Sequence, residues 1–207
     1  MKLYALPHSM NSRKLLALIH HLDLPVEIVA MEVDQVRSDD FAAINPNRLT
    51  PTLVDGDFTL WESNAIGIHL AQDSMMLPTG HHARMDMLRW LLWEGVHYNK
   101  ALGNIFFEGV VRPQMGWGEP NQGLVDESLQ EIERRLPVLD AHLAANPWML
   151  GDRLSFVDFA MASAEPYRGR MPIDFDRFAN VQRWYEKVAA LPAWAKACGK
   201  AQVTEAA

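Results

Sequence analysis

Cysteine is almost absent from this sequence, because Cys198 is the only one among 207 residues. A single cysteine excludes an intrachain disulfide and is typical of proteins in a reducing cytoplasm. The sequence also lacks an apolar run of about 18 residues, the length that a membrane-spanning helix needs. Its opening, MKLYALPHSM, reaches Pro7 too soon to form the apolar core of a signal peptide. We therefore expect a cytoplasmic protein that does not cross a membrane.

Positive charge is scarce as well. The chain carries 19 Lys and Arg residues against 26 Asp and Glu, which gives a formal charge of −7. That balance disfavours nucleic acid as a partner, since phosphate neutralisation needs clustered basic residues. The sequence contains no HxxxH, no CxxC and no glycine-rich phosphate loop, and its histidine pairs, His20-His21 and His81-His82, are adjacent residues with poor geometry for one metal ion. We expect no metal site.

The most informative stretch of the chain is NPNRLTPTLVDGDFTLWESNAI, residues 45–66. It begins with turn residues at 45–47, and a short apolar strand follows at 52–54. Asp55-Gly56-Asp57 predicts a tight hairpin, because an Asp-Gly step supplies the positive φ that primed turns need. A returning strand at 58–60 then leads into a helix that opens at 62–64.

The start of that helix is a potential anion site. Ser63 or Asn64 is suited to cap it. The free N–H groups of a first helical turn and the positive end of the helix dipole point outward together, which favours a bound anion.

The first 75 residues predict an α/β unit in the order βαβ, loop, ββα. A strand at 2–6 is followed by a helix at 13–22, which Asn11 or Ser12 can cap. A second strand covers 26–33, and the polar residues 34–40 indicate a loop.

Everything after a linker at 76–84 is predicted to be helical. A long helix begins at Met85 and ends near Val111, and the segment from Pro113 to Gly123 breaks it. A second amphipathic helix follows at 124–145, where Pro137 predicts a kink or a break. Further on, Ser155 and Asp158 have the spacing of a capping box, ahead of an apolar helix that we expect to be buried.

Two motifs resemble the cytosolic glutathione transferase superfamily. The first is the series Asn45-Pro46, Thr50-Pro51, the hairpin and Glu62-Ser63; the second is Gly-Asp-Arg-Leu-Ser-x-x-Asp at 151–158. The resemblance covers essentially the whole chain and is nearest to the bacterial serine-type classes. It implies a thioredoxin-like α/β domain at 1–75 that binds glutathione, and an all-α domain at 85–207 that shapes the site for an electrophile.

The chemistry that this family performs requires a hydrogen-bond donor to the thiol of glutathione, since only the thiolate is a good nucleophile. The resemblance implies that Ser9, just after the first strand, is this catalytic donor; Asn11 and Ser12 are the alternatives. A cysteine-dependent thiol transferase is disfavoured, because the family places its cysteine where this chain has none.

The resemblance also implies which residues hold glutathione. Pro51 is cis in the family, Thr50 pairs its backbone with the cysteinyl part of the ligand, and Glu62 with Ser63 holds the γ-glutamyl end. Leu49 is a departure, because several classes carry Gln or Lys at that position; Arg48 is the side chain that would reach over instead. The implied contacts come from Arg37 (to the glycine carboxylate), Leu49, Thr50, Pro51, Glu62 and Ser63.

The electrophile pocket is expected between the domains, with some of its lining from Met10, His97, Tyr98, Asn104, Phe106, Phe107, Met115 and Trp117. We thus interpret the chain as a homodimeric glutathione transferase that conjugates apolar electrophiles or reduces organic hydroperoxides, a detoxification role. Two alternatives stay open: a glutathione-dependent isomerase, dehalogenase or lyase on the same scaffold, and a non-catalytic binding module.

Overall fold

The structure is a computed structural model, and it describes residues 1–199. These residues form two compact units. The first unit contains Met1–Leu77 together with the described residues from Ala190 onward, and the second contains Pro78–Ala189. Residues 190–199 therefore group with the first unit, whereas the sequence predicts that everything from residue 85 onward belongs to the helical domain. The last eight residues of that expected domain lie outside the described residues.

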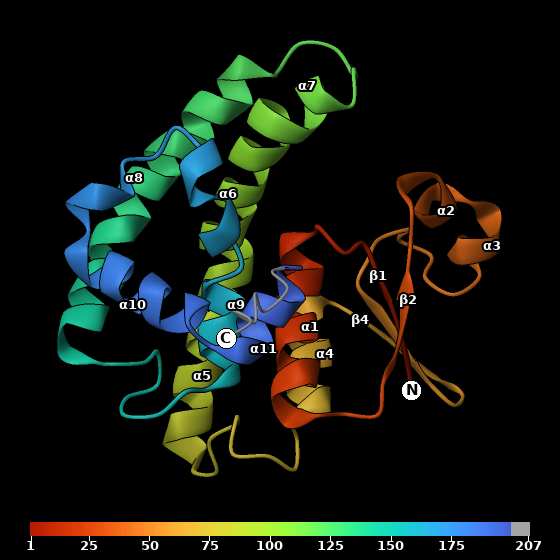
Figure 1. The fold of residues 1–207 in the computed structure, drawn as a ribbon, viewed down its shortest axis with the longest axis horizontal. Helices are drawn as coiled ribbons and strands as arrows, with labels where there is room; N and C mark the ends of the chain where they lie inside the picture. The colour runs from red at the N-terminus through yellow and green to blue at the C-terminus, as the bar shows by residue number, and fades with distance from the viewer. Residues whose placement is uncertain (200–207) are drawn as a thin grey trace, which may run out of the picture. The chain divides into compact units, whose positions relative to one another are not determined.

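A mixed sheet of four described strands is the centre of the first unit (Figure 1). The strands are β1 (Lys2–Ala5), β2 (Glu27–Ala30), β3 (Thr52–Asp55) and β4 (Phe58–Trp61), in the spatial order β2-β1-β3-β4. β1 pairs with β2 in parallel and with β3 antiparallel, and β3 and β4 form the predicted hairpin. Gly56 at its tip has φ +59°, which an L-residue with a side chain adopts only at a cost.

Helices cover both faces of this sheet. α1 (Met10–Leu22) and α4 (Ser63–Leu70) lie on one face, while α2 (Val33–Arg37) and α3 (Asp39–Ala42) lie on the other (Figure 1). α11 (Pro192–Ala197) packs against α1. The apolar residues that alternate along the strands and recur along α1 and α4 are buried, which gives the unit its core: Leu3, Leu15, Leu18, Leu53 and Ile66.

The polar residues 34–40, predicted to be a loop, are largely helical, and β2 ends before residue 33. Local capping explains the difference. Glu32 and Gln35 form a capping box at α2, and the Ser38 hydroxyl accepts the Phe41 N–H at 3.2 Å to begin α3. These caps stabilise helices that are too short to show a periodic apolar pattern.

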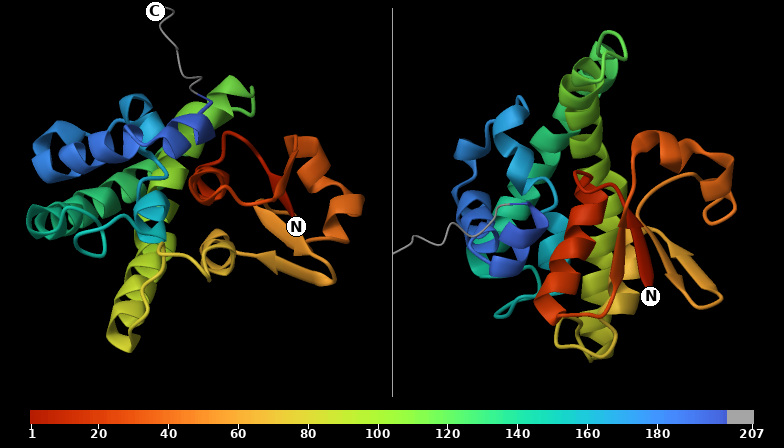
Figure 2. Two further views of the ribbon diagram at one scale, coloured as in Figure 1. Left: turned by 60° about the horizontal axis from the view of Figure 1, so that its bottom comes forward. Right: turned by 45° about the vertical axis from the view of Figure 1, so that its right-hand side comes forward.

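The second unit begins with a long helical rod (Figure 2). It is continuous from residue 81 to residue 114, so the predicted long helix is confirmed but longer at both ends, and Pro113 lies inside it. Two π-helical segments interrupt its α-helical hydrogen bonding. The rod consists of α5 (His81–Trp93), η1 (Glu94–Tyr98), α6 (Asn99–Phe106), η2 (Phe107–Val111) and α7 (Arg112–Gln114).

The remaining helices pack in the same unit. The predicted amphipathic helix at 124–145 is present, and Pro137 does not break it. The helix after the capping box is buried along its whole length, as its apolar sequence predicts. These elements are α8 (Gln122–Ala145), α9 (Phe156–Met161), η3 (Glu165–Arg170), η4 (Phe175–Arg177) and α10 (Ala179–Ala189).

The buried carboxylate of Asp158 accepts four hydrogen bonds within this unit. Its Oδ2 accepts the N–H and the hydroxyl of Ser155 at 2.9 and 2.8 Å, which confirms the predicted capping box. Its Oδ1 accepts the Met149 N–H at 2.8 Å and the Trp184 Nε1–H at 3.0 Å. Burial raises the pKa of the Asp158 carboxyl, and these donors oppose the rise. One side chain thus joins α9, the turn at Met149 and α10.

Candidate functional site

Three chain segments meet at one edge of the sheet in the first unit. Tyr4 of β1 lies opposite Thr52 of β3, and Thr52 lies opposite Trp61 of β4. β1 and β4 are both antiparallel to β3, so they run in the same direction and both end at the edge where β3 begins. The residues that follow β1 and β4, and those that precede β3, are therefore brought together.

Ser9 follows β1 at this edge. It is the N-cap residue of α1, with φ −73° and ψ 134°, and its hydroxyl caps no N–H group of the described chain. Its own N–H donates to the Leu6 carbonyl oxygen at 3.0 Å, which closes the turn between strand and helix. The Ser9 hydroxyl is consequently available to a ligand while its backbone is fixed.

The predicted caps Asn11 and Ser12 are wrong, because the helix begins earlier, at Met10. Both residues lie inside α1. The Ser12 side chain is fully buried, and its hydroxyl finds no hydrogen-bond partner among residues 1–199. Asn11 is half-buried. Of the three donors considered, Ser9 alone stands at the junction of strand and helix.

The loop before β3 is organised by a buried amide, that of Asn45. Its Nδ2 donates to the Leu49 carbonyl oxygen at 2.8 Å and to Thr52 Oγ1 at 2.9 Å, and its Oδ1 accepts the Asn47 N–H at 3.0 Å. The Thr50–Pro51 peptide bond inside this loop is cis, the form that the resemblance implies. The sequence pattern indicates only a turn at Asn45, and these contacts show that its side chain also holds the loop together.

Arg48 does not take the place expected of it. Its guanidinium donates to the Arg37 carbonyl oxygen and to Asp39 Oδ1, both at 2.6 Å. These contacts tie the loop to α2 and α3, so the prediction that Arg48 reaches over to a ligand is not supported. Leu49 beside it is 63% exposed, while Arg37 is exposed at the end of α2.

The helix that follows β4 begins with an unusual backbone. Glu62 has φ 70° and ψ 109°, a conformation that non-glycine residues rarely adopt and that costs free energy. α4 begins at Ser63, and the side chain of its N-cap residue, Glu62, makes no capping hydrogen bond. The predicted caps Ser63 and Asn64 are instead the first two helical residues. A strained residue thus stands directly before the first turn of α4.

The residues expected around an electrophile differ in their surroundings. Tyr98 is buried in the core, where its hydroxyl lies 3.0 Å from that of Tyr185, and burial raises the pKa of both hydroxyls above their ordinary value. Met10 is buried in the first unit. Phe106 stacks on Tyr167, with ring centroids 4.2 Å apart. By contrast, the side chains of Phe107 and Met115 are exposed.

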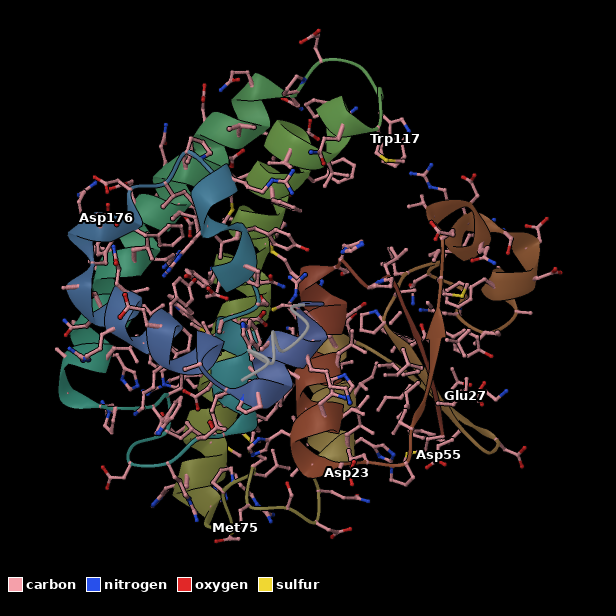
Figure 3. The ribbon with its side chains drawn as sticks, in the orientation of Figure 1. Asp23, Glu27, Asp55, Met75, Trp117 and Asp176 are labelled. Carbon is pink, nitrogen blue, oxygen red and sulfur yellow. The ribbon has the colours of Figure 1, made fainter. Side chains whose placement is uncertain are left out.

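The loop from Met115 to Asn121 is held by a partly buried ion pair. Arg112 donates to both oxygens of Glu108 at 2.6 and 3.1 Å, and its Nη1 donates to the Trp117 carbonyl oxygen at 3.0 Å. Glu108 also accepts the Asn121 N–H at 2.8 Å. The hydrogen bonds from Arg112 hold the pKa of Glu108 below its ordinary value. The pair thus fixes the loop that carries Trp117, labelled in Figure 3.

Neither a membrane span nor a metal cluster is found in the part of the chain that the structure describes. No helix within residues 1–199 combines the length and the apolarity that crossing a bilayer takes. Over the same residues, no three His, Cys, Asp or Glu side chains gather closely enough to hold a metal ion.

Sequence comparisons decide the family. Residues 1–72 match the profile described as glutathione S-transferase, N-terminal domain, and residues 98–192 match the C-terminal domain of the same family. Glutathione S-transferase 3 of Zea mays is 32% identical, over 95% of this chain and 92% of its own length. The chain belongs to the glutathione S-transferase family. Glutathione S-transferase GstB of Escherichia coli is also 32% identical, over 90% of this chain and 91% of its own length.

Solved structures of glutathione transferases have the same fold. The theta class enzyme of Xanthomonas axonopodis pv. citri, solved with glutathione bound, is 25% identical and superposes with a TM-score of 0.85. That alignment covers 97% of each chain. The predicted fold class, an α/β unit with a mixed sheet followed by a helical unit, is therefore confirmed for this glutathione S-transferase family member.

Proposed function

We propose that this chain is a glutathione transferase of the serine type, which binds glutathione at the sheet edge of its first unit and activates the thiol through Ser9. The observation that carries the proposal is the meeting of three segments at that edge: the Ser9 turn, the cis Thr50–Pro51 bond and the start of α4 at Ser63. Relatives named as glutathione transferases over nearly the full length of the chain support it.

Each end of glutathione has a proposed partner. The γ-glutamyl carboxylate binds the backbone N–H and the hydroxyl of Ser63, where the helix dipole favours an anion. The carboxylate of Glu62 binds the amino group beside that carboxylate of the ligand. The strained backbone of Glu62 supports this role, because such conformations cluster at ligand-binding sites. The backbone of Thr50 pairs with the cysteinyl part, as in an added strand.

The glycyl end of glutathione is the least defined. The Leu49 side chain has no polar atom, and its carbonyl oxygen already accepts hydrogen bonds from Asn45 and Thr52. Arg48 is engaged with the α2–α3 segment. The proposed partner of the glycyl carboxylate is therefore the exposed Arg37 at the end of α2.

The proposed reaction has a simple proton and electron balance. The thiol of glutathione loses its proton to water, and the Ser9 hydroxyl donates a hydrogen bond to the thiolate while keeping its own proton. The sulfur then donates an electron pair to the electrophilic carbon, and the leaving group departs with the bonding pair. With an organic hydroperoxide, the thiolate attacks the outer oxygen and releases the alcohol; a second glutathione converts the sulfenic acid to the disulfide and water.

The quaternary structure and location are also part of the proposal. A homodimer follows from the family resemblance, and an exposed apolar strip on the rod supports it, because Leu92 is 65% and Val96 60% exposed at helical spacing. A cytoplasmic location is in keeping with the single cysteine.

Steady-state kinetics with chlorodinitrobenzene test the proposed activity. Ser9→Ala should lower kcat about 100-fold, the loss expected when one donor to a developing anion is removed. Its equilibrium affinity for glutathione should stay within about threefold, since Ser63 and Thr50 hold the rest of the ligand. Asn11→Ala is the matched control and should keep its activity. Full activity in Ser9→Ala, or a loss confined to Asn11→Ala, would refute the assignment of Ser9.

A further inference from the structure

An aromatic side chain, that of Phe107, is exposed near the end of the long rod, where it is the first residue of the π-helical segment η2. It is 39% exposed, and it is the one aromatic residue among the large apolar side chains exposed in the described part of the second unit. Met115, directly after α7, is 51% exposed. Segments of π-helix occur frequently at functional sites. The surface around Phe107 is therefore a candidate for binding a ligand.

The loop beside Phe107 is fixed by its backbone and by Arg112. Trp117 stands between Gly116, with φ +67°, and Gly118, with φ +89°, conformations that residues with a side chain rarely adopt. The Arg112 Nη1 donates to the Trp117 carbonyl oxygen at 3.0 Å. The ring centroids of Phe107 and Trp117 are 6.1 Å apart, within the range of interacting aromatic pairs. The two rings thus belong to one aromatic surface.

Arg112 connects the parts of this surface. Its guanidinium donates to both carboxylate oxygens of Glu108, at 2.6 and 3.1 Å, and its Cζ lies over the Phe107 ring, 5.5 Å from the centroid. The same side chain therefore contacts Phe107 and holds the loop that carries Trp117. Because Glu108 compensates its charge, the surface is complementary to an uncharged ring rather than to an anion.

We propose that Arg112 is a positioning residue for the electrophile: by holding Trp117 beside Phe107, it sets a preference for uncharged aromatic electrophiles over alkyl ones. A flat ring packs against an aromatic surface, whereas a methyl group buries too little area to gain much from it. Arg112 takes no part in the chemical step. This inference rests on the proposed function and deepens it, because it names a residue that selects the class of electrophile.

Isothermal titration with two glutathione conjugates tests the inference without turnover. The ligands are S-(dinitrophenyl)glutathione and S-methylglutathione, which differ only in the group on sulfur. Arg112→Gln should bind the dinitrophenyl conjugate about fivefold more weakly than the wild type, the scale of one aromatic pair, and S-methylglutathione equally well. Arg135→Gln breaks the corresponding i,i+4 ion pair with Glu131 on α8. It is the matched control and should change neither affinity.

A double-mutant cycle shows whether Arg112 acts through the aromatic surface. Phe107→Leu alone should also weaken binding of the dinitrophenyl conjugate about fivefold. Because both substitutions disrupt the same surface, the double variant should bind this conjugate no more than about tenfold more weakly than the wild type. Multiplication of the two single effects, to about 25-fold, would show independent roles and overturn the inference.

The remaining outcomes separate the inference from the proposed function. Equal affinity of the wild type for the two conjugates, or equal weakening of both by Arg112→Gln, would overturn the role of Arg112 while leaving the glutathione site intact. A wild type that binds neither conjugate would refute the proposed function and this inference with it. If thermal melting shows that Arg112→Gln is unfolded, Trp117→Leu serves instead. It should lower the preference for the dinitrophenyl conjugate about fivefold, and an unchanged preference would overturn the inference.

Discussion

Replacing Asp158 by alanine should destabilise the protein far more than an ordinary capping mutation. The substitution removes an acceptor of four hydrogen bonds and leaves the N–H groups of Met149 and Ser155 and the Nε1–H of Trp184 without it. All three residues are buried. A buried donor without a partner costs about 1–3 kcal/mol. Because burial raises the pKa of the Asp158 carboxyl, removing it also relieves a desolvation cost, and we expect a net loss of about 3–5 kcal/mol.

Asp140 provides a matched comparison in the same unit. Its carboxylate accepts hydrogen bonds from the N–H groups of Asn180 and Val181 at 2.9 and 3.1 Å, in the first turn of α10. Because Asp140 is only half-buried, water can replace its carboxylate as the acceptor. Asp140→Ala should therefore cost only about 1–2 kcal/mol, the range of a lost N-cap.

Thermal unfolding followed by circular dichroism measures the difference. For a chain of this length, 1 kcal/mol corresponds to a shift in Tm of about 2–4 °C. Asp158→Ala should thus lower Tm by about 10 °C, and Asp140→Ala by about 4 °C. A Tm for Asp158→Ala equal to or above that of Asp140→Ala would refute the argument that burial of the unpartnered donors determines how much stability the substitution removes.

Two further predictions concern the helical unit. Since hydrogen bonds from Arg112 lower the pKa of Glu108, the pair stabilises the fold above the ordinary glutamate pKa of 4.5, and this contribution is lost as the pH falls through the lowered value. Glu108→Gln should therefore show a smaller fall in Tm between neutral and acidic pH, and a pH profile identical to that of the wild type would contradict this. Leu92→Glu should convert a dimer to a monomer in analytical ultracentrifugation, while Val138→Glu, at an exposed site on α8, should not. A monomeric wild type would rule out the dimer.

Features specified by neighbouring residues could be predicted from the sequence. The hairpin at Gly56 depends on a local need for positive φ, and the capping box of Ser155 and Asp158 depends on residues three apart. The long helices can be predicted from the helical spacing of their apolar residues. The family motif at 45–66 combines several such local signals, which is why it indicated the site.

Helix starts were predicted less well, since they depend on where the preceding strand ends. β1 ends at Ala5, and the turn closed by the Ser9 N–H leads directly into α1, so Asn11 and Ser12 fall inside the helix. The short α2 was missed because its five residues show no periodicity, although the spacing of Glu32 and Gln35 carried its capping signal.

Contacts between distant segments could not be predicted from the sequence. No sequence pattern showed that Lys14 is buried against Asn64, or that Arg48, expected at the ligand, is bound to Asp39. Single-sequence patterns report which residue types are near in the chain, not which partners meet in the fold. The same limit applies to residues 190–199, whose helix α11 packs on α1.

Ultraviolet difference titration of the protein with glutathione across pH tests the central claim most directly, because it reports thiolate formation itself. We expect the wild type to show a thiolate band at lower pH than free glutathione does. We expect Ser9→Ala to lose this band, with binding retained in both proteins. A band that persists unchanged in Ser9→Ala would contradict the claim that the Ser9 hydroxyl stabilises the thiolate.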